Sequence, residues 1–113
     1  MLNNNSPASG IACATTAEGV LVTIWGEVDV TLRPVAAEVV AQVGKAIADS
    51  TPVIIDASDL TFIDSSGVAF ILQLYSLGQG SGSQVSLRDP SPTLVEVLDM
   101  VGIGERIPVI SVG

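Results

Sequence analysis

Apolar and polar positions alternate along the chain in blocks that predict strands and helices in turn. Residues 11–16 (IACATT) and 20–25 (VLVTIW) are short apolar runs on either side of a tight AEG turn, which is typical of a β-hairpin. From Pro34 onward, apolar residues recur at helical spacing, which predicts a helix that ends near Asp49. The positions that show this spacing are Ala36, Val39, Val40, Val43 and Ile47.

The middle of the chain continues the same alternation. Residues 52–58 (PVIIDAS) are a nearly continuous apolar run with β-branched residues, typical of a strand covered on both faces. A helix is predicted over residues 66–77, followed by a flexible loop at 78–84 (GQGSGSQ) and a third buried strand at 85–87 (VSL). The glycines 80 and 82 of that loop do not predict a phosphate-binding loop, because the loop follows a helix and has no nearby lysine.

The last part of the chain predicts one more helix and one more strand. Ser91 and Pro92 mark a helix start, and Gly102 marks its stop. Residues 106–110 (RIPVI) indicate a short strand, which Pro108 places at a sheet edge. We therefore expect an α/β fold with a mixed sheet of about four to five strands and three or more helices packed against it.

The ends of the chain set the expected domain boundaries. Residues 1–10 (MLNNNSPASG) have no basic start and no apolar segment, so we expect a mobile tail and no secretory signal. Residues 11–113 are expected to form the single domain. No apolar run reaches the roughly 18 residues that a membrane-spanning helix needs. We expect a cytoplasmic protein.

Composition limits the classes of function. Of the 113 residues, 48% are hydrophobic and 14% are charged, so some apolar surface is expected to meet a partner. Twelve acidic and four basic residues give a net charge of −8. Such a charge disfavours binding to nucleic acid and to anionic membranes, and it favours a basic protein partner.

The sequence lacks residues that most catalytic mechanisms need. Histidine is absent and Cys13 is the single cysteine, which excludes Ser-His and Cys-His catalysis and the usual zinc-ligand sets. Cys13 falls in a predicted strand and is interpreted as a small core residue, with a reactive thiol as the alternative. We expect a protein that is not an enzyme and has no cofactor.

Three acidic residues lie near predicted strand ends, namely Asp29, Asp56 and Asp64. Together they could hold Mg²⁺ or accept a phosphoryl group. Receiver-type domains pair such acids with a lysine, but Lys45, the single lysine, falls in the first predicted helix. The alternative is that all three are solvated turn residues or helix caps, and no metal site is predicted.

The segment Asp64-Ser65-Ser66-Gly67 stands where a strand-like stretch ends and an apolar helix begins. Asp and Ser are strong N-cap residues, because their oxygens accept hydrogen bonds from the amides of the first turn. A serine at this position is also exposed, and a phosphate there would meet free N–H groups and the positive end of the helix dipole. The residues alone leave both interpretations open, a helix cap and a phosphate acceptor.

The helix that follows carries two apolar stripes. One stripe consists of Val68, Ile71, Leu72 and Tyr75, and the other consists of Phe70, Leu74 and Leu77. At 100° per residue the two stripes face nearly opposite directions. One stripe is expected to cover the sheet. The other is either buried as well or forms a docking surface beside the two serines.

Three blocks of the sequence resemble the STAS-domain anti-sigma factor antagonists, also called anti-anti-sigma factors. They are GEVD at 26–29, VIIDASDLTFIDSSGVAFIL at 53–72 and SPTLVEVLDMVGIG at 91–104, within a similarity that spans about residues 20–109. The resemblance implies a single STAS-like domain. The sequence differs from the family in three places. They are the segment VTLRPV (30–35), Leu74, where relatives often carry a polar or basic residue, and the apparent absence of the family's C-terminal helix.

The resemblance implies a cytoplasmic bacterial regulator that works by partner switching. Ser65, with Ser66 as runner-up, would be phosphorylated by an anti-sigma factor that has a kinase-like ATP-binding fold. The unphosphorylated protein would bind that anti-sigma factor and free a sigma factor for transcription, for example in a stress response. A serine phosphatase would reset the switch.

The predicted partner-binding residues are Asp29, Asp64, Ser65, Ser66, Gly67, Phe70 and Leu74. The oligomeric state stays open, a homodimer included. Two alternatives also stay open at this point. One is a STAS subunit that docks constitutively in a larger assembly, such as a lipid-transport ATPase, and the other is a STAS domain that senses a small ligand or nucleotide.

Overall fold

The computed structural model describes residues 8–48 and 50–110. In chain order the elements are β1 (Gly10–Thr16), β2 (Gly19–Val28), the 3-10 turn η1 (Val30–Leu32), α1 (Arg33–Ala46), β3 (Val53–Ile63), α2 (Ser65–Gly80), β4 (Val85–Arg88), α3 (Pro92–Met100), the 3-10 turn η2 (Gly104–Arg106) and β5 (Val109–Ile110). None of the helices among these residues is long and apolar enough to cross a membrane.

The sheet follows chain order, β1-β2-β3-β4-β5. β1 and β2 form the predicted antiparallel hairpin, and every later neighbour is parallel. The turn needs a glycine, because Gly19 has a φ of +132° and a Cβ there would lie 2.4 Å from the carbonyl oxygen of Pro52. The mixed sheet with helices packed against it confirms the predicted α/β fold.

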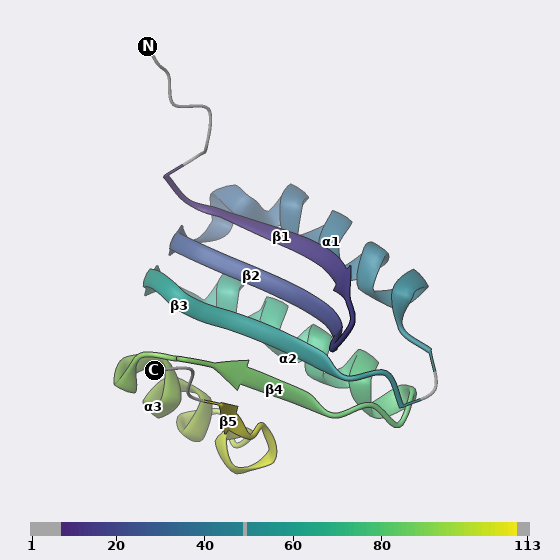
Figure 1. Ribbon diagram of the computed structural model, residues 1–113. Helices are drawn as coiled ribbons and strands as arrows, with labels where there is room; N and C mark the ends of the chain where they lie inside the picture. Colours follow the sequence, from purple (N-terminus) through teal and green to yellow (C-terminus); the bar gives the residue numbers. More distant parts are fainter. Residues whose placement is uncertain (1–7, 49, 111–113) are drawn as a thin grey trace.

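One face of the sheet carries the core. Figure 1 shows α1 and α2 side by side behind β1 to β3, with α3 beside β4 and β5. The most completely buried large side chains are Ile24, Ile55, Ile71, Leu74, Leu87, Leu94, Leu98 and Ile107. Cys13 is half-buried and packs against this core, as the sequence predicts. Burial raises the pKa of the Cys13 thiol, which disfavours the reactive thiolate.

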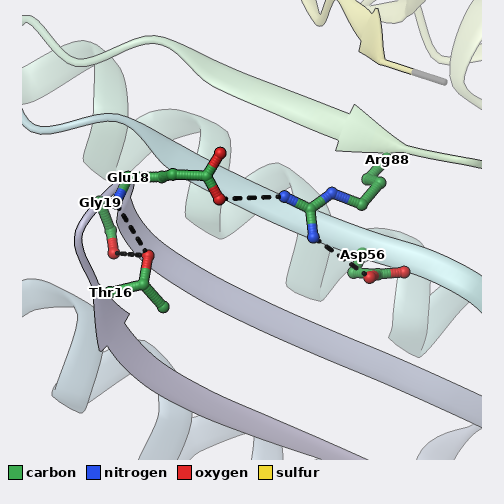
Figure 2. Close-up of polar contacts among 5 residues, drawn as sticks. All are labelled: Thr16, Glu18, Gly19, Asp56 and Arg88. Carbon is green, nitrogen blue, oxygen red and sulfur yellow. Dashed lines mark hydrogen bonds and ion pairs between the residues drawn. The ribbon is translucent and has the colours of Figure 1, made fainter. Parts of the chain in front are cut away.

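The opposite face of the sheet carries an ion-pair cluster (Figure 2). The guanidinium of Arg88 on β4 lies 3.6 Å from a carboxylate oxygen of Asp56 on β3 and 3.6 Å from one of Glu18 in the hairpin turn. Because strand side chains alternate between faces, Asp56 points away from the core that its neighbour Ile55 enters. This cluster ties the hairpin turn to the far strands.

Several predicted boundaries are wrong, the largest difference being at β3, which is predicted to end at residue 58 and ends at Ile63. α1 ends at Ala46, before Asp49, and α2 continues to Gly80, so the predicted loop at 78–84 loses its first three residues. Gly78 does not supply flexibility. It is buried, and a Cβ there would lie 2.4 Å from Cγ2 of Val85, so the glycine lets the end of α2 approach β4.

The first strand also begins one residue earlier than predicted. β1 starts at Gly10, and the hydroxyl of Ser9 accepts a hydrogen bond of 2.8 Å from the amide of Glu27. Residues 1–7 of the predicted tail lie outside the described residues, as do residues 111–113. Ser9 and Gly10, which the sequence predicts to be part of the tail, are therefore bound to the hairpin or part of it.

β3 is the strand that positions the remaining features. Its first residues, 53–56, pair with β4, whereas its later residues pair with β2 alone. Residues 57–63 therefore extend past β4, toward the start of α3. At the end of this extension Ile63 is in register with Val28 of β2, so the two parallel strands finish together at one edge of the sheet.

Candidate functional site

Two predicted site residues meet at this edge of the sheet. Asp29 follows Val28 and Asp64 follows Ile63, so neighbouring parallel strands each end in a carboxylate. The amide of Asp64 also donates a hydrogen bond of 3.2 Å to the carbonyl oxygen of Val28. The sheet register thus brings together two acids that lie 35 positions apart in the sequence.

Asp64 is the N-cap of α2. Its Oδ1 accepts hydrogen bonds from the amides of Ser66 at 2.8 Å and Gly67 at 3.1 Å. These are two of the four amides that a helix start leaves without an intrahelical partner. The cap interpretation is correct for Asp64. The acceptor in this cap is the Asp64 carboxylate and not a serine hydroxyl.

The two serines differ in accessibility. Ser65 is the first residue of α2 and is exposed, and its hydroxyl forms no hydrogen bond within residues 8–48 and 50–110. Ser66 is half-buried and faces the cavities between α2 and α1. An incoming enzyme would therefore reach the Ser65 hydroxyl more easily than that of Ser66.

Gly67 is required by close packing. It is buried, and a Cβ at this position would lie 2.4 Å from Cγ1 of Ile63 and 3.0 Å from the carbonyl oxygen of Val28. A side chain here would push the start of α2 away from the strand ends. The glycine thereby fixes the position of Ser65 relative to the sheet edge.

Asp29 is held in place by Thr31. The hydroxyl and the amide of Thr31 both donate to Oδ1 of Asp29, the amide at 3.0 Å. These bonds hold the pKa of Asp29 below its ordinary value. Asp29 is thereby the N-cap of the turn η1, whereas α1, which follows directly, has Leu32 at its N-cap and no side-chain cap.

Arg33 is a nearby residue that the sequence interpretation misses. It lines a small cavity together with Asp29 and Ser66, and it also lines the larger groove between α1 and α2. Within the described part of the chain it forms no ion pair with an acidic side chain. One signal could have indicated it: a cation in the first turn of a helix opposes the helix dipole.

Phe70 and Leu74 need a correction. Both were predicted to contact a partner, but their exposed fractions are 2% and 0%. The reason is that α2 packs against the sheet on one side and against α1 on the other, so both apolar stripes contribute buried residues. The side chains of α2 that remain exposed on its outer surface are Ser65, Ala69, Gln73, Ser76 and Gln79.

Asp56 does not join Asp29 and Asp64. It lies in the interior of β3, where it pairs with Arg88 and accepts hydrogen bonds from the amide and hydroxyl of Ser58. Among residues 8–48 and 50–110, no group of three or more Cys, Asp or Glu side chains could hold a metal ion. The hypothesis of a three-carboxylate site is therefore wrong for these residues.

Comparisons with known proteins agree with this geometry. A family model described as "Mlab, STAS domain" matches residues 11–111. The structure is similar to the anti-sigma factor antagonist SpoIIAA in its unphosphorylated form, with a TM-score of 0.68, 23% identity, and 94% of this chain and 89% of that chain covered. Among curated proteins the comparison finds no match.

Two further solved structures are similar. One is the Bacillus cell fate determinant SpoIIAA in its phosphorylated form, with 26% identity, a TM-score of 0.63 and coverage of 94% of this chain and 92% of that chain. The other is an anti-sigma factor antagonist domain from Planctomyces limnophilus, with 20% identity, a TM-score of 0.74 and coverage of 91% and 90%. These similarities confirm the fold class that the sequence predicts.

Proposed function

The chain belongs to the STAS domain family, and we propose that it is an anti-sigma factor antagonist whose binding is controlled by phosphorylation of Ser65. One observation carries this proposal: the Ser65 hydroxyl is exposed and unbonded within the described residues, at a helix start that Asp64 already caps. The protein acts by binding rather than by catalysis. Its partner is an anti-sigma factor with a kinase-like ATP-binding fold, and a serine phosphatase restores the unmodified form.

The switch follows from local charge. A phosphate adds roughly −1.5 to −2 charges at pH 7, next to Asp64 and near Asp29. Against an acidic group of the partner about 4 Å away, the repulsion at an effective dielectric of 20 reaches ~4 kcal/mol per pair of unit charges. Half of that weakens binding more than tenfold, because each ~1.4 kcal/mol is a factor of ten.

The fold is compatible with modification. Asp64 accepts from the first amides of α2 whether or not Ser65 is modified, so the helix cap does not depend on the Ser65 hydroxyl. We therefore expect the phosphorylated domain to stay folded and the change to be confined to the binding surface. That surface includes Asp29, Asp64, Ser65 and the exposed edge of Ser66.

A binding experiment tests the proposal. Kinase-like anti-sigma factors from the same cell are purified and mixed with wild type, Ser65→Ala and Ser65→Asp, and affinities are measured by calorimetry. Wild type and Ser65→Ala should bind one of them equally, and Ser65→Asp should bind at least tenfold more weakly. The proposal fails if no such factor binds the wild type.

The description of the matching family model favours a second candidate, a STAS subunit that docks constitutively in a larger assembly such as a lipid-transport ATPase. In that case the start of α2 would be a permanent contact and Ser65 would not be modified. Ser65→Asp separates the two candidates. A complex that survives this substitution with unchanged affinity favours constitutive docking.

A further inference from the structure

A large apolar side chain is exposed close to the proposed switch. Phe62, near the end of β3, is 52% exposed, although it lies only three positions before Ser65. It belongs to the part of β3 that extends past β4, so among the described residues no strand pairs with β3 on that side. Single exposed apolar residues are common on protein surfaces, so the significance of Phe62 comes from the groove that it lines.

Phe62 forms one wall of a groove of about 260 Å³ between the end of β3 and α3. Leu60, Phe62 and Ile63 line it from the strand, and Leu94 and Val97 line it from the helix. The groove is smaller than the 300–1,000 Å³ typical of pockets for small molecules. Its size suits one or two anchoring side chains of a docked polypeptide segment.

The residues that flank the lining segments of this groove in the sequence are acidic. Asp59 and Asp64 stand directly before and after the lining residues of β3, and Glu96 adjoins Val97 on α3. No lysine or arginine is among the described residues that line the groove. Arg88, the basic residue of β4, is paired with Glu18 and Asp56.

The groove between α1 and α2 has the opposite character. Arg33 and Gln73 line it together with Ser66, and no acidic side chain is among its described lining residues. A cationic segment would therefore meet a like charge at Arg33 in that groove and complementary charges at the groove beside Phe62. Charge complementarity distinguishes the two grooves.

We propose that the groove between the end of β3 and α3 docks a basic segment of the anti-sigma factor, with one apolar side chain held against Phe62 and the half-buried Val97 and with lysine or arginine residues beside Asp59 and Glu96. This inference rests on the proposed function. It extends the binding surface from Ser65 back along β3, because Ile63 in the groove directly precedes Asp64. The contact supplies affinity, and the phosphate on Ser65 regulates it.

The first experiment measures the affinity of the full chain for its anti-sigma factor. Phe62→Ser should weaken binding at least tenfold, and Glu96→Lys should weaken it severalfold and reduce its salt dependence. Val35→Ser is the matched control, because Val35 is an exposed apolar residue on α1 that lines neither groove. Unchanged binding by Phe62→Ser, with an unchanged melting temperature, overturns the groove assignment and leaves the Ser65 proposal standing.

A second experiment does not depend on the anti-sigma factor. The isotope-labelled chain is titrated with a short peptide in which phenylalanine is flanked by lysines, and with its glutamate analogue. The lysine peptide should shift the amide signals of residues 60–63 and 94–97, and Phe62→Ser should abolish these shifts. Absent shifts, or equal shifts with the glutamate peptide, contradict the groove proposal even if no anti-sigma factor binds.

Discussion

The starts of α2 and α3 are two solutions to one problem. Each helix begins after a parallel strand and needs oxygen atoms for its free amides. At α2 the carboxylate of Asp64 accepts from two amides, and the following Ser65 is exposed. At α3 the hydroxyl of Ser91 itself accepts from the amide of Leu94 at 3.2 Å, with Pro92 next in the chain.

The difference separates a structural serine from an available one. Ser91 is half-buried and its oxygen is engaged in the cap, so modification would disturb the start of α3. The hydroxyl of Ser65 is not part of a cap, because the carboxylate of Asp64 caps α2. A helix start that is capped by the residue before the serine, as at α2, can present a hydroxyl to a kinase without loss of stability.

The largest effect is expected at Gly67. Gly67→Ala should lower the free energy of unfolding by about 1–3 kcal/mol, because the new Cβ overlaps Ile63 and the carbonyl of Val28. Gly80→Ala, in the same helix, is the control, since a Cβ there meets nothing within 4 Å. Chemical denaturation of both variants checks this. Equal stability of the two variants would contradict the packing role of Gly67.

The next effect concerns the cap of α2. Asp64→Ala removes the acceptor of two amides and should cost about 0.5–2 kcal/mol. Asp64→Asn keeps an acceptor oxygen and should cost clearly less. Thermal unfolding compares the two variants. If the asparagine variant lost as much stability as the alanine variant, charge rather than capping would explain the role of Asp64.

The two serines then test the comparison directly. Ser91→Ala should lower the free energy of unfolding by about 1 kcal/mol through loss of a cap. Ser65→Ala, an exposed substitution without a bonded partner, should change it by no more than about 0.5 kcal/mol. Denaturation curves measured side by side give both values. A larger loss for Ser65→Ala than for Ser91→Ala would reverse the assignment of roles.

The smallest effect is the acid titration of Asp29. Its pKa is lowered by the hydrogen bonds from Thr31, so the stability they contribute is present above the ordinary aspartate pKa of roughly 3.9 and is lost as the pH falls through the lowered value. Thr31→Val should raise the pKa of Asp29 toward the ordinary value. Carboxyl NMR signals report this shift. An unchanged titration would show that the hydroxyl does not set the pKa.

Local patterns predicted the elements well because their causes are local. The helical spacing from Ala36 to Ile47 and the Ser91-Pro92 start both correspond to observed helices. Gly78 was misread because a glycine needed for helix–strand packing looks the same in sequence as a flexible one. Its role depends on Val85, which the fold brings to it.

The site was only partly predictable for the same reason. Asp64 and Ser65 could be placed because a cap and its helix are neighbours in sequence. Whether Phe70 and Leu74 are exposed depends on α1, which packs against the other side of α2. The exposure of Phe62 likewise depends on how far β4 extends, and a propensity argument does not reveal this.

The most direct test of the central claim is to map the phosphorylation site. The full chain and its Ser65→Ala and Ser91→Ala variants are incubated with the kinase-like anti-sigma factor that binds the wild type and with ATP, and intact masses and fragment spectra are recorded. We predict one phosphate, on Ser65, in the wild type and in Ser91→Ala, and none in Ser65→Ala. A phosphate on Ser66 or Ser91, or one that persists in Ser65→Ala, would contradict the account.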